Sequence, residues 1–445
     1  MGKKNRVILF YGKTEEQKDW HWMPINMLFL SSTLVKEGYE ITIIDERVTP
    51  KYEDQLLNIL PDAVFFGISS FSGYQIKSGL KAAEIVKKHR PDQKIVWGGT
   101  HPSSLPKQML KNRFVDIVVR GQGEKVIYDL VKAFETSKKY VNVSGIIYKN
   151  GREVVSNPIQ LFDINTIPEL PFHLLDVEKY INPVTRALNY TTSVGCSGYC
   201  TFCFWASKSA NKWQAFDNKR VLDDIEMLTK KYELKIIKFM DANFFRNESR
   251  LVELCEGILK RKIKVKWNAE GRVNEFGALS EETLTLCEKA GLNSVFFGLE
   301  SVSPRILKLM NKRTTPEQAI MLVKKTKDRS FKILFSLMFG LPLETIEDLK
   351  LTGEFIKKSI EINPQIHYQR SVFAPYPATG MFNLAVSRGY QPPERFEDWQ
   401  DFNPQSGNFR EKPTWFSESF FREYMELFVK LFPQENDYLK HLRTE

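Results

Sequence analysis

Cysteine is scarce in this sequence, which has only five in 445 residues. So small and odd a number excludes a disulfide framework of the kind that stabilises small secreted proteins. Long apolar runs are also missing, because no stretch approaches the ~18 residues that a membrane-spanning helix needs. The N-terminal segment turns polar after a short apolar run, so we expect no signal peptide. These absences predict a cytoplasmic protein without a membrane span.

The sequence also lacks a dense block of one charge. Its 64 Lys and Arg exceed its 54 Asp and Glu and give a net charge of +10, but the basic residues are spread along polar helix faces. We therefore expect no nucleic-acid partner, although an acidic ligand would suit the excess. The composition is that of an ordinary globular protein. A single core seldom exceeds roughly 250–300 residues, so we expect two or three domains.

Residues 1–140 alternate short apolar runs, rich in Val, Ile and Phe, with amphipathic stretches. This pattern predicts βα units and a doubly wound, Rossmann-like α/β domain. Ligands of such folds bind at the carboxyl ends of the strands. The Gly- and Ser-rich loops 69–73, 98–103 and 121–124 fall there. A hairpin with an Asn-Gly turn and a Pro-rich linker follow in residues 141–186.

Residues 187–378 contain six more strand-like runs separated by amphipathic stretches. Six consecutive βα units predict a partial (β/α)6 barrel of the TIM type, with its chemistry again at the carboxyl ends of the strands. Residues 379–445 form an irregular extension that is rich in aromatic residues. This extension is either a lid that shapes a substrate site or only a packing cap, and the second is the commoner use of aromatic residues.

Three of the five cysteines, Cys196, Cys200 and Cys203, fall close together after the first strand-like run of the barrel. Three thiolates on so short a loop can hold three corners of a 4Fe–4S cluster. The fourth iron is then open and can bind a substrate or cosubstrate. A zinc site is one alternative, but it needs a fourth ligand and the only nearby histidine is His173. Chance proximity of three cysteines is the other.

With this CxxxCxxC motif, in which Phe202 precedes the last cysteine, the sequence resembles the radical S-adenosylmethionine (SAM) superfamily. It is similar in particular to the cobalamin-dependent members, which carry an N-terminal cobalamin-binding domain, and the similarity extends to about Thr379. The resemblance implies a 4Fe–4S cluster whose open iron chelates SAM. One electron then cleaves SAM to methionine and a 5′-deoxyadenosyl radical, which abstracts a hydrogen atom. It also implies an electron donor of the flavodoxin or ferredoxin type.

The resemblance assigns further SAM-binding roles to residues at the ends of later strands. Asp241 and Asn243 lie where the family has acidic or polar residues near the SAM amino group, and Arg272 could pair with the SAM carboxylate. Glu300 and Ser301 match a GxES motif that contacts the ribose and methionine ends, and Phe202 completes the set. Each has a structural alternative, such as a helix cap for Asp241 or Asn243 and a surface ion pair for Arg272.

The N-terminal domain resembles the cobalamin domain of the family in its strand-end loops, where small residues would let the nucleotide tail approach the backbone. The segment Asp19 to Pro24 keeps the Asp and His of a D-x-H-x-x-G motif but has Pro where Gly is expected. Either His21 ligates cobalt, or Trp20, His21 and Trp22 wall off the lower corrin face, which we favour because radical SAM relatives usually omit that ligand. The cobalamin-binding candidates are His21, Ser70, Ser72, Gly73, Gly98, Gly99, His101, Gly121, Gly123 and Glu124.

These features together favour a cobalamin-dependent radical SAM methyltransferase. One SAM would methylate cobalamin and a second would form a substrate radical, so that an unactivated carbon or a phosphinate of a peptide, lipid or natural product becomes methylated. The alternative is a cobalamin-binding cyclase or rearranging enzyme without methyl transfer, and a third reading is a non-catalytic cobalamin- or RNA-binding protein. Cys255 and Cys287 are too few for a second cluster, and we expect them in the core.

The last barrel strand and the turn after it supply the substrate candidates. An aromatic lining there would suit a peptide, a lipid or a natural product equally well. Side chains alternate along a strand, so neighbouring candidates on it face opposite sides. The candidates are His367, Tyr368, Arg370 and Tyr376.

Overall fold

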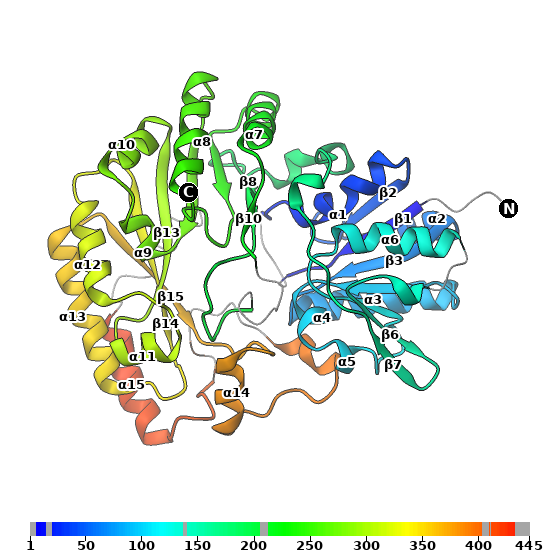
Figure 1. Ribbon diagram of the computed structural model, residues 1–445. Helices are drawn as coiled ribbons and strands as arrows, with labels where there is room; N and C mark the ends of the chain where they lie inside the picture. The colour runs from blue at the N-terminus through cyan, green and yellow to red at the C-terminus, as the bar shows by residue number, and fades with distance from the viewer. Residues whose placement is uncertain are drawn as a thin grey trace. The chain divides into compact units, whose positions relative to one another are not determined.

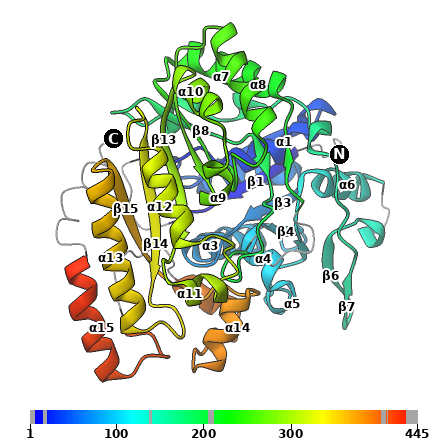
Figure 2. The ribbon, with the colours of Figure 1, turned by 60° about the vertical axis from the view of Figure 1, so that its left-hand side comes forward.

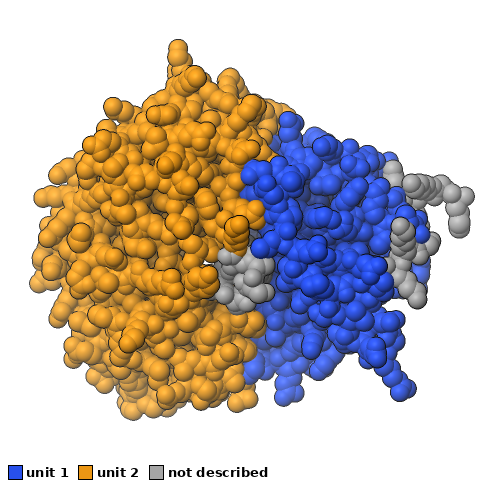
Figure 3. Space-filling view, in the orientation of Figure 1, with its two compact units in different colours: residues 1–180, 208–210, 392–403 blue, residues 181–207, 211–391, 404–445 orange. Residues whose placement is uncertain are grey.

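The computed structural model describes residues 6–14, 20–136, 140–204, 212–402, 409 and 411–431. Figure 1 follows the chain by colour from its N- to its C-terminus. The chain divides into two compact units, coloured in Figure 3: unit 1 comprises residues 1–180, 208–210 and 392–403, and unit 2 comprises residues 181–207, 211–391 and 404–445. Each unit has its own large sheet. The domain limits that we predicted stay predictions.

Unit 1 is built on a seven-stranded sheet in the order β2-β1-β3-β4-β5-β6-β7. The first five strands are parallel, and β6 and β7 are antiparallel to their neighbours. An order of 2-1-3-4-5 is that of a doubly wound fold, so the predicted Rossmann-like architecture is confirmed. The strands are β1 (Arg6–Tyr11), β2 (Glu40–Asp45), β3 (Ala63–Ser69), β4 (Ile95–Gly98), β5 (Ile117–Val119), β6 (Ile146–Asn150) and β7 (Glu153–Ser156).

Helices cover this sheet because its central strands are apolar on both faces. Residues 7–10 of β1 are all buried, as a parallel strand between two helical layers requires. α1 packs against α6, and α2 packs against α3. The helices are α1 (Ile25–Lys36), α2 (Glu53–Ile59), α3 (Tyr74–His89), α4 (Thr100–Ser104), α5 (Pro106–Met109) and α6 (Glu124–Glu135). The sequence order reverses between β1 and β3, and the carboxyl ends of these two strands are the expected ligand crevice.

Two local predictions in unit 1 can be compared with the structure. The predicted hairpin forms as β6 and β7, joined by Gly151 and Arg152, and it extends the sheet beside β5. Segment 98–103, which we expected to be a loop, contains the short helix α4, so that expectation was wrong. The helix follows Gly99, whose φ of +104° turns the chain directly out of β4.

Unit 2 is built on a six-stranded sheet in the order β15-β14-β13-β12-β11-β8. All neighbouring pairs are parallel, which confirms the six strands of the predicted partial barrel. The strands are β8 (Ala187–Tyr190), β11 (Ile236–Phe239), β12 (Lys266–Gly271), β13 (Leu292–Glu300), β14 (Lys332–Phe339) and β15 (Ile366–Val372), and a separate antiparallel pair is formed by β9 (Ser193–Val194) and β10 (Gln214–Ala215).

Most helices of unit 2 lie along the outer face of these strands, as Figures 1 and 2 show. Their starts are set locally, because the side chains of Ser280, Ser303, Thr315 and Thr345 each accept a hydrogen bond from a backbone N–H of the first turn. The helices are α7 (Asn218–Tyr232), α8 (Glu248–Lys260), α9 (Val273–Gly277), α10 (Glu281–Lys289), α11 (Pro304–Leu309), α12 (Pro316–Lys325), α13 (Ile346–Ile362), α14 (Gly380–Ser387) and α15 (Glu418–Leu431).

The core of unit 2 lies between the strands and these helices. In β13, Val295, Phe297 and Leu299 alternate toward the helices and have no measurable exposure. Cys255 and Cys287 are also fully buried, with their sulfurs 3.8 Å apart, so the prediction that they are core residues is confirmed. The other face of the strands is left for polar residues near the carboxyl ends. Within the described residues, no helix combines the length and the apolar character needed to cross a membrane.

The aromatic residues of the C-terminal extension are divided between the two units. Phe396 and Trp399, each 1% exposed, belong to unit 1, where η7 (Glu397–Asp401) packs against α3. Phe416, Tyr424 and Phe428 are buried in unit 2, where α15 packs against α13. Burial of this extent supports the packing-cap interpretation for the described part of the extension.

The contact between this cap and the barrel centres on the carboxylate of Glu344. Its Oε2 accepts hydrogen bonds from the N–H groups of Gly340 and Leu341, at 2.7 and 3.1 Å, and from the hydroxyl of Tyr424 at 2.8 Å. Gly340 has a φ of +75°, and a Cβ there would lie 2.6 Å from the ring of Phe409. Complete burial raises the pKa of Glu344 to about 7, although its three donors act in the opposite direction.

We predict that the stability of the protein contains a pH-dependent contribution from Glu344. The folded chain retains a proton on this carboxyl that the unfolded chain releases near pH 4.5, so this contribution falls as the pH rises from there through about 7. Urea titrations measure the free energy of unfolding of the wild type and of Glu344→Gln. As the pH rises across that range, the wild type should lose about 3 kcal/mol relative to Glu344→Gln. Glu347→Gln, at an exposed position of α13, is the matched control. Parallel pH profiles for wild type and Glu344→Gln would contradict the prediction.

Candidate active site

The three clustered cysteines lie on a loop that follows the edge strand β8 and the short strand β9. All three are free thiols; Cys200 is 6% exposed, and Cys196 and Cys203 are half-buried. Gly195 begins the loop with a φ of +79°, and a Cβ there would lie 2.6 Å from a backbone oxygen, so the turn requires glycine. The N–H of Gly198 points at the sulfur of Cys196 at 3.3 Å. The loop thus carries three thiols within eight residues.

The same loop is held from its other side through Thr201. Its N–H and hydroxyl donate to the carbonyls of Met310 and Leu309, at 2.9 and 3.0 Å, at the end of α11. Its carbonyl accepts from the N–H of Met381 in α14 at 2.9 Å. The neighbouring Phe202 packs against the apolar cluster between these two helices. Four hydrophobic or backbone contacts therefore fix the part of the loop between the second and third cysteines.

Asp241, at the end of β11, anchors the chain just before the loop. It is fully buried, and its oxygens accept hydrogen bonds from the N–H and hydroxyl of Thr192, at 3.1 and 2.8 Å, and from the hydroxyl of Ser193 at 2.5 Å. Burial raises the pKa of Asp241, and these donors oppose the shift. Neither a helix cap nor a free carboxylate is seen here. Asp241 holds the connection between β8 and β9, which sets where the cysteine loop starts.

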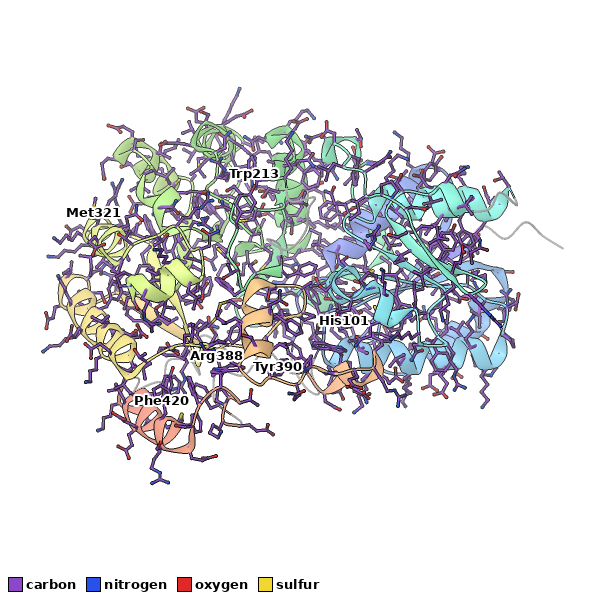
Figure 4. The ribbon with its side chains drawn as sticks, turned by 60° about the horizontal axis from the view of Figure 1, so that its bottom comes forward. His101, Trp213, Met321, Arg388, Tyr390 and Phe420 are labelled. Carbon is purple, nitrogen blue, oxygen red and sulfur yellow. The ribbon has the colours of Figure 1, made fainter. Side chains whose placement is uncertain are left out.

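Asn243 lies two residues further on, and the oxygen of its side-chain amide has no hydrogen-bond partner among the described residues. Its Nδ2 donates to Glu275 at 2.5 Å, and its backbone carbonyl accepts from the indole of Trp213, labelled in Figure 4, at 3.2 Å. Its Oδ1 is buried and has no hydrogen-bond partner among the described residues. Glu275, in α9, also accepts from the hydroxyl of Ser197 in the cysteine loop at 3.4 Å. The unpartnered Oδ1 of Asn243 fits the expected contact with the amino group of SAM. Glu275, which holds the other amide atom, was missed by sequence reasoning.

Arg272 does not make the surface ion pair that was its alternative role. It is 8% exposed; its Nη1 approaches the sulfur of Cys200 at 3.6 Å, and its Nη2 donates to the carbonyl of Lys312 at 2.6 Å. Burial lowers the pKa of Arg272, but Cys200, Cys196 and Glu275 together raise it by more, so that it lies above its ordinary value. The guanidinium therefore faces the cysteine loop, and these two contacts occupy both of its terminal nitrogens.

Glu300 and Ser301 end β13 close to the same loop. A carboxylate oxygen of Glu300 lies 3.4 Å from the ammonium of Lys312, and the hydroxyl of Ser336 lies 3.5 Å from the other oxygen. The Lys312 ammonium stands 5.5 Å from the ring centroid of Phe202. The hydroxyl of Ser301 accepts from a backbone N–H in the turn before α11. Sequence reasoning missed Lys312, because nothing distinguishes it from the many other basic residues of the chain.

Two of the four substrate candidates were assigned wrongly. The ring of Tyr368 packs against Phe335 and the Tyr368 hydroxyl contacts Ser359 of α13, while the guanidinium of Arg370 lies 5.3 Å from an aromatic ring of α15. Both side chains face the helices, because every second residue of β15 points outward. His367 is on the opposite face. Tyr376 lies near the third cysteine of the loop, and burial, together with the charge of Cys203, raises the pKa of its phenol to about 12.

In unit 1, Gln75 of α3 bridges the loops that follow β1 and β3. This side chain is 2% exposed; its Nε2 donates to the carbonyl of Gly12, after β1, and its Oε1 accepts from the N–H of Phe71, after β3, at 3.2 and 2.9 Å. Phe71 itself is 48% exposed, which is unusual for so large an apolar side chain. The loops on either side of the switch point are therefore tied together, and an aromatic ring projects from them.

The segment after β1 carries the predicted histidine. Trp20 and Trp22 stack edge to face, with ring centroids 4.1 Å apart, and the half-buried His21 lies between them in sequence. The Trp20 indole donates to the carbonyl of Tyr180 at 2.8 Å, and the carbonyl of Trp22 accepts from Arg47 at 3.0 Å. Asp19, which would orient the histidine, lies outside the described residues. The anchored tryptophan pair is compatible with the interpretation of this segment as a wall.

His101, labelled in Figure 4, follows β4 and is completely buried. Its Nδ1 lies 2.8 Å from the hydroxyl of Ser72, and its ring is packed between Phe396 and Trp399, with centroids 5.7 and 5.3 Å away. Burial lowers the pKa of His101 to about 3, so the imidazole is neutral at pH 7. Its Nε2 and the hydroxyl of Ser70 are both buried without a hydrogen-bond partner among the described residues. Two unpartnered polar atoms thus lie at the ends of neighbouring strands.

The predicted glycines of unit 1 are explained in part by the fold itself. Gly73 and Gly99 have φ values of +98° and +104°, and a Cβ would lie 2.2 Å from the carbonyl of Phe402 and 2.7 Å from that of Ser70, respectively. These two positions require glycine even without a ligand. Gly98 has only ordinary contact distances around it. Gly121, Gly123 and Glu124 connect β5 to α6, of which Glu124 is the first residue.

The donor set in unit 2 suits an iron–sulfur cluster better than a single ion. Within the described ranges, no three His, Cys, Asp or Glu side chains are grouped to hold one metal ion, so the zinc alternative finds no ligand set. A 4Fe–4S cluster is held through separate iron atoms, so its thiolates surround the cluster and do not meet at one point. Three thiols on one short loop, with a guanidinium beside Cys200, fit that requirement.

Two family models match the chain. The model described as "B12 binding domain" matches residues 16–131, which lie in unit 1. The model described as "Radical SAM superfamily" matches residues 190–356, which lie almost entirely in unit 2 and include the cysteine loop and the ends of β11 to β14. The two kinds of strand-end site described above therefore fall within two separate, recognised domains.

Curated proteins with similar sequences carry different activities in their names. An uncharacterized methyltransferase from Pyrococcus horikoshii is 29% identical over 371 residues, which are 82% of this chain and 78% of that protein. The anaerobic magnesium-protoporphyrin IX monomethyl ester cyclase of Rubrivivax gelatinosus is 29% identical over 381 residues, which are 81% of this chain but only 66% of the cyclase. The chain thus spans just under two thirds of the second relative.

Solved structures agree on the fold. The structure of OxsB, a cobalamin-dependent S-adenosylmethionine radical enzyme with aqua-cobalamin and S-adenosylmethionine bound, has a TM-score of 0.78 at 19% identity, covering 96% of this chain and 66% of that one. The radical S-adenosylmethionine methyltransferase TsrM from Kitasatospora setae, with cobalamin and a [4Fe-4S] cluster bound, has a TM-score of 0.69 at 17% identity, covering 88% and 76%. At such identities the likeness concerns the fold alone.

We predict that Asp241→Asn lowers both stability and iron content. An amide in place of the carboxylate turns an N–H₂ group toward donors, which should cost about 1–3 kcal/mol and displace the start of the cysteine loop. Urea titration and iron analysis after anaerobic reconstitution measure the two effects. Asp223→Asn, which removes exposed ion pairs of α7, should leave both unchanged. Normal stability and iron content with weakened SAM binding would show instead that Asp241 contacts SAM.

A second prediction concerns the aromatic residues divided between the units. Trp399→Ala should lower the free energy of unfolding of unit 1 by about 3–5 kcal/mol, because it removes a fully buried indole that packs on His101. Hydrogen exchange read by mass spectrometry should then show faster exchange in β3 and β4 while β14 stays protected. Trp415→Ala, whose indole donates to Gly340 in unit 2, should give the reverse pattern. Loosening of unit 2 by Trp399→Ala would be inconsistent with the division described here.

Proposed function

Because this chain belongs to the radical SAM enzymes that carry a B12-binding domain, we propose that it is a methyltransferase acting on an unactivated carbon or a phosphinate of its substrate. A radical SAM domain uses a 4Fe–4S cluster and SAM, and a B12-binding domain uses cobalamin. The observation that carries the proposal is the presence of a radical SAM domain and a B12-binding domain in one chain. Cobalamin can hold a methyl group, which a substrate radical needs in order to become methylated.

In unit 2, the proposed roles follow from the contacts of each side chain. Cys196, Cys200 and Cys203 would hold the cluster, and the guanidinium of Arg272 would place a positive charge beside the second cysteine. The buried Oδ1 of Asn243 would accept a hydrogen bond from the SAM ammonium. When bound, the cluster supplies the electron that cleaves SAM, and cobalamin carries the methyl group.

In unit 1, cobalamin would be held by the strand-end side chains around the switch point. The neutral His101 would use its Nε2, together with the Ser70 hydroxyl, to hydrogen-bond polar groups of the cofactor. The exposed ring of Phe71 would contact its apolar surface. We propose that His21, between Trp20 and Trp22, borders the lower face of the corrin and does not ligate cobalt.

A second candidate function is supported by the similarity to the cyclase of Rubrivivax gelatinosus. A cyclase or rearranging enzyme would use the same cluster and SAM contacts without transferring a methyl group. The substrate class that we propose is a peptide, a lipid or a natural product, contacted by His367 and Tyr376. Radical SAM enzymes need an electron donor. We propose one of the flavodoxin or ferredoxin type.

The two candidates differ in what becomes of the methyl group of SAM. The protein is reconstituted anaerobically with iron, sulfide and hydroxocobalamin, and is then given titanium(III) citrate and SAM with a deuterated methyl group. A methyltransferase should release S-adenosylhomocysteine in an amount equal to the bound cobalamin before any substrate is added, because methyl loss from SAM precedes substrate methylation. Liquid chromatography with mass spectrometry measures S-adenosylhomocysteine and 5′-deoxyadenosine separately.

Cysteine variants provide the controls for this experiment. Replacing Cys196, Cys200 and Cys203 together by Ala should abolish 5′-deoxyadenosine, because the cluster has no ligands. Replacing Cys255 and Cys287 by Ala, which lie in the core, should leave both products. Formation of 5′-deoxyadenosine without S-adenosylhomocysteine would refute methyl transfer and favour the cyclase.

A further inference from the structure

Arg272 is buried beside the cysteine loop, and no carboxylate of the described residues forms a salt bridge with it. Its side chain is 8% exposed. The charge of Glu275 acts on it, but the oxygens of Glu275 already accept hydrogen bonds from Asn243 and Ser197. Burying a cation without a bonded partner of opposite charge costs free energy, so a negative group is expected next to this guanidinium.

Backbone atoms fix where this guanidinium points. Its Nη2 donates to the carbonyl of Lys312 at 2.6 Å, and the N–H of Lys312 donates in turn to the carbonyl of Leu307 at 3.0 Å. A Cβ on Gly198 would lie 2.5 Å from its Nη1, so glycine at this place in the cysteine loop leaves the space that the guanidinium occupies. The sulfur of Cys200 lies 3.6 Å from the same Nη1. The geometry therefore directs one N–H group of Arg272 at the second thiol.

A second N–H group points at the first thiol. The backbone N–H of Gly198 lies 3.3 Å from the sulfur of Cys196. This donor is neutral, whereas the guanidinium of Arg272 is charged, and a charge-assisted hydrogen bond is roughly twice as strong as a neutral one. Two of the three thiols thus have an N–H donor, and the stronger donor belongs to Arg272.

Such donors favour the reduced state of a cluster that the same sulfurs hold. In the reduction, one electron passes from an external donor to the cluster, no bond breaks, and the total charge of the cluster and its thiolates becomes more negative by one unit. Hydrogen bonds to the sulfurs and a positive charge beside them stabilise the added electron, and they do so more strongly where water is excluded. The reduction potential of the cluster should therefore depend on Arg272.

We propose that Arg272 raises the reduction potential of the 4Fe–4S cluster by donating a charged hydrogen bond to the thiolate of Cys200. The residue then eases the transfer of the electron that cleaves SAM. This role differs from a contact with the SAM carboxylate, because both terminal nitrogens of the side chain are already engaged. The inference rests on the proposed role of the three cysteines as cluster ligands and not on methyl transfer.

The test measures the reduction potential of the cluster in the whole chain, reconstituted anaerobically with iron and sulfide. The protein is titrated with dithionite in the presence of redox mediators and without SAM, and electron paramagnetic resonance measures the reduced fraction. At the potential where half of the wild-type clusters are reduced, the ratio of reduced to oxidised clusters in Arg272→Gln should be about 10-fold lower, because the charged hydrogen bond is lost. Arg272→Lys keeps the charge without the fork of donors and should show a smaller fall.

The control is Arg313→Gln. Arg313 is an exposed cation whose guanidinium lies 5.5 Å from the ring centroid of Tyr199, in the same cysteine loop. Solvent screens its charge, so the ratio in Arg313→Gln should match that of the wild type. An equal fall in both variants would show that any positive charge near the loop sets the potential, and it would overturn the assignment to Arg272.

Iron content is measured for every variant, and SAM binding is measured by anaerobic equilibrium dialysis on the oxidised protein. A wild-type potential in Arg272→Gln, together with weaker SAM binding, would return Arg272 to the SAM carboxylate and overturn the proposal. If Arg272→Gln does not assemble a cluster, Gly198→Ala decides, because its methyl group displaces the guanidinium and should also lower the ratio. An unchanged ratio in Gly198→Ala then overturns the proposal. Clusters that titrate as proposed in a protein that releases no S-adenosylhomocysteine would disprove methyl transfer alone.

Discussion

The hydrogen bonds to the buried carboxylate of Asp241 fix the start of the cysteine loop, and the arrangement of unit 2 around the thiols depends on them. β8 has four residues and stands at the edge of its sheet, so it has a partner strand on one side only. Asp241 belongs to the loop after that partner and holds Thr192 and Ser193, which continue from β8. Thr201 then ties the far part of the loop to α11 and α14. The loop that carries the three thiols is thus anchored at both of its ends.

Three charged side chains are buried beside the cysteine loop: Arg272, Glu300 and Lys312. A thiolate, and not a thiol, is the metal ligand, and the guanidinium of Arg272 places a positive charge beside Cys200. Next to it, Glu300 and Lys312 carry opposite charges that the backbone holds together at a cost in strain. Burying either charge without a partner of opposite charge would cost more free energy. The site therefore combines Arg272, which contacts Cys200, with Glu300 and Lys312, which contact each other.

The C-terminal extension has a structural role that its aromatic content alone does not reveal. Trp399 packs on the neutral His101 of unit 1, and Tyr424 donates to Glu344 of unit 2. Each unit thus completes its core with a segment that is distant in the sequence. In unit 1, this segment also accounts for Gly73, because the carbonyl of Phe402 occupies the space that a Cβ would need.

The sequence by itself determined the order of strands and helices, the two domain types and the three thiols, because periodicity, helix caps and a closely spaced motif are all local signals. Only the tertiary structure decided which side chains meet. Tyr368 and Arg370 face the helices although their strand has no clear apolar alternation, and Glu300 meets Lys312 where the pairing of β13 with β14 shifts register. Such contacts join loops that are far apart in the chain, and no local pattern records the register or the turn that brings them together.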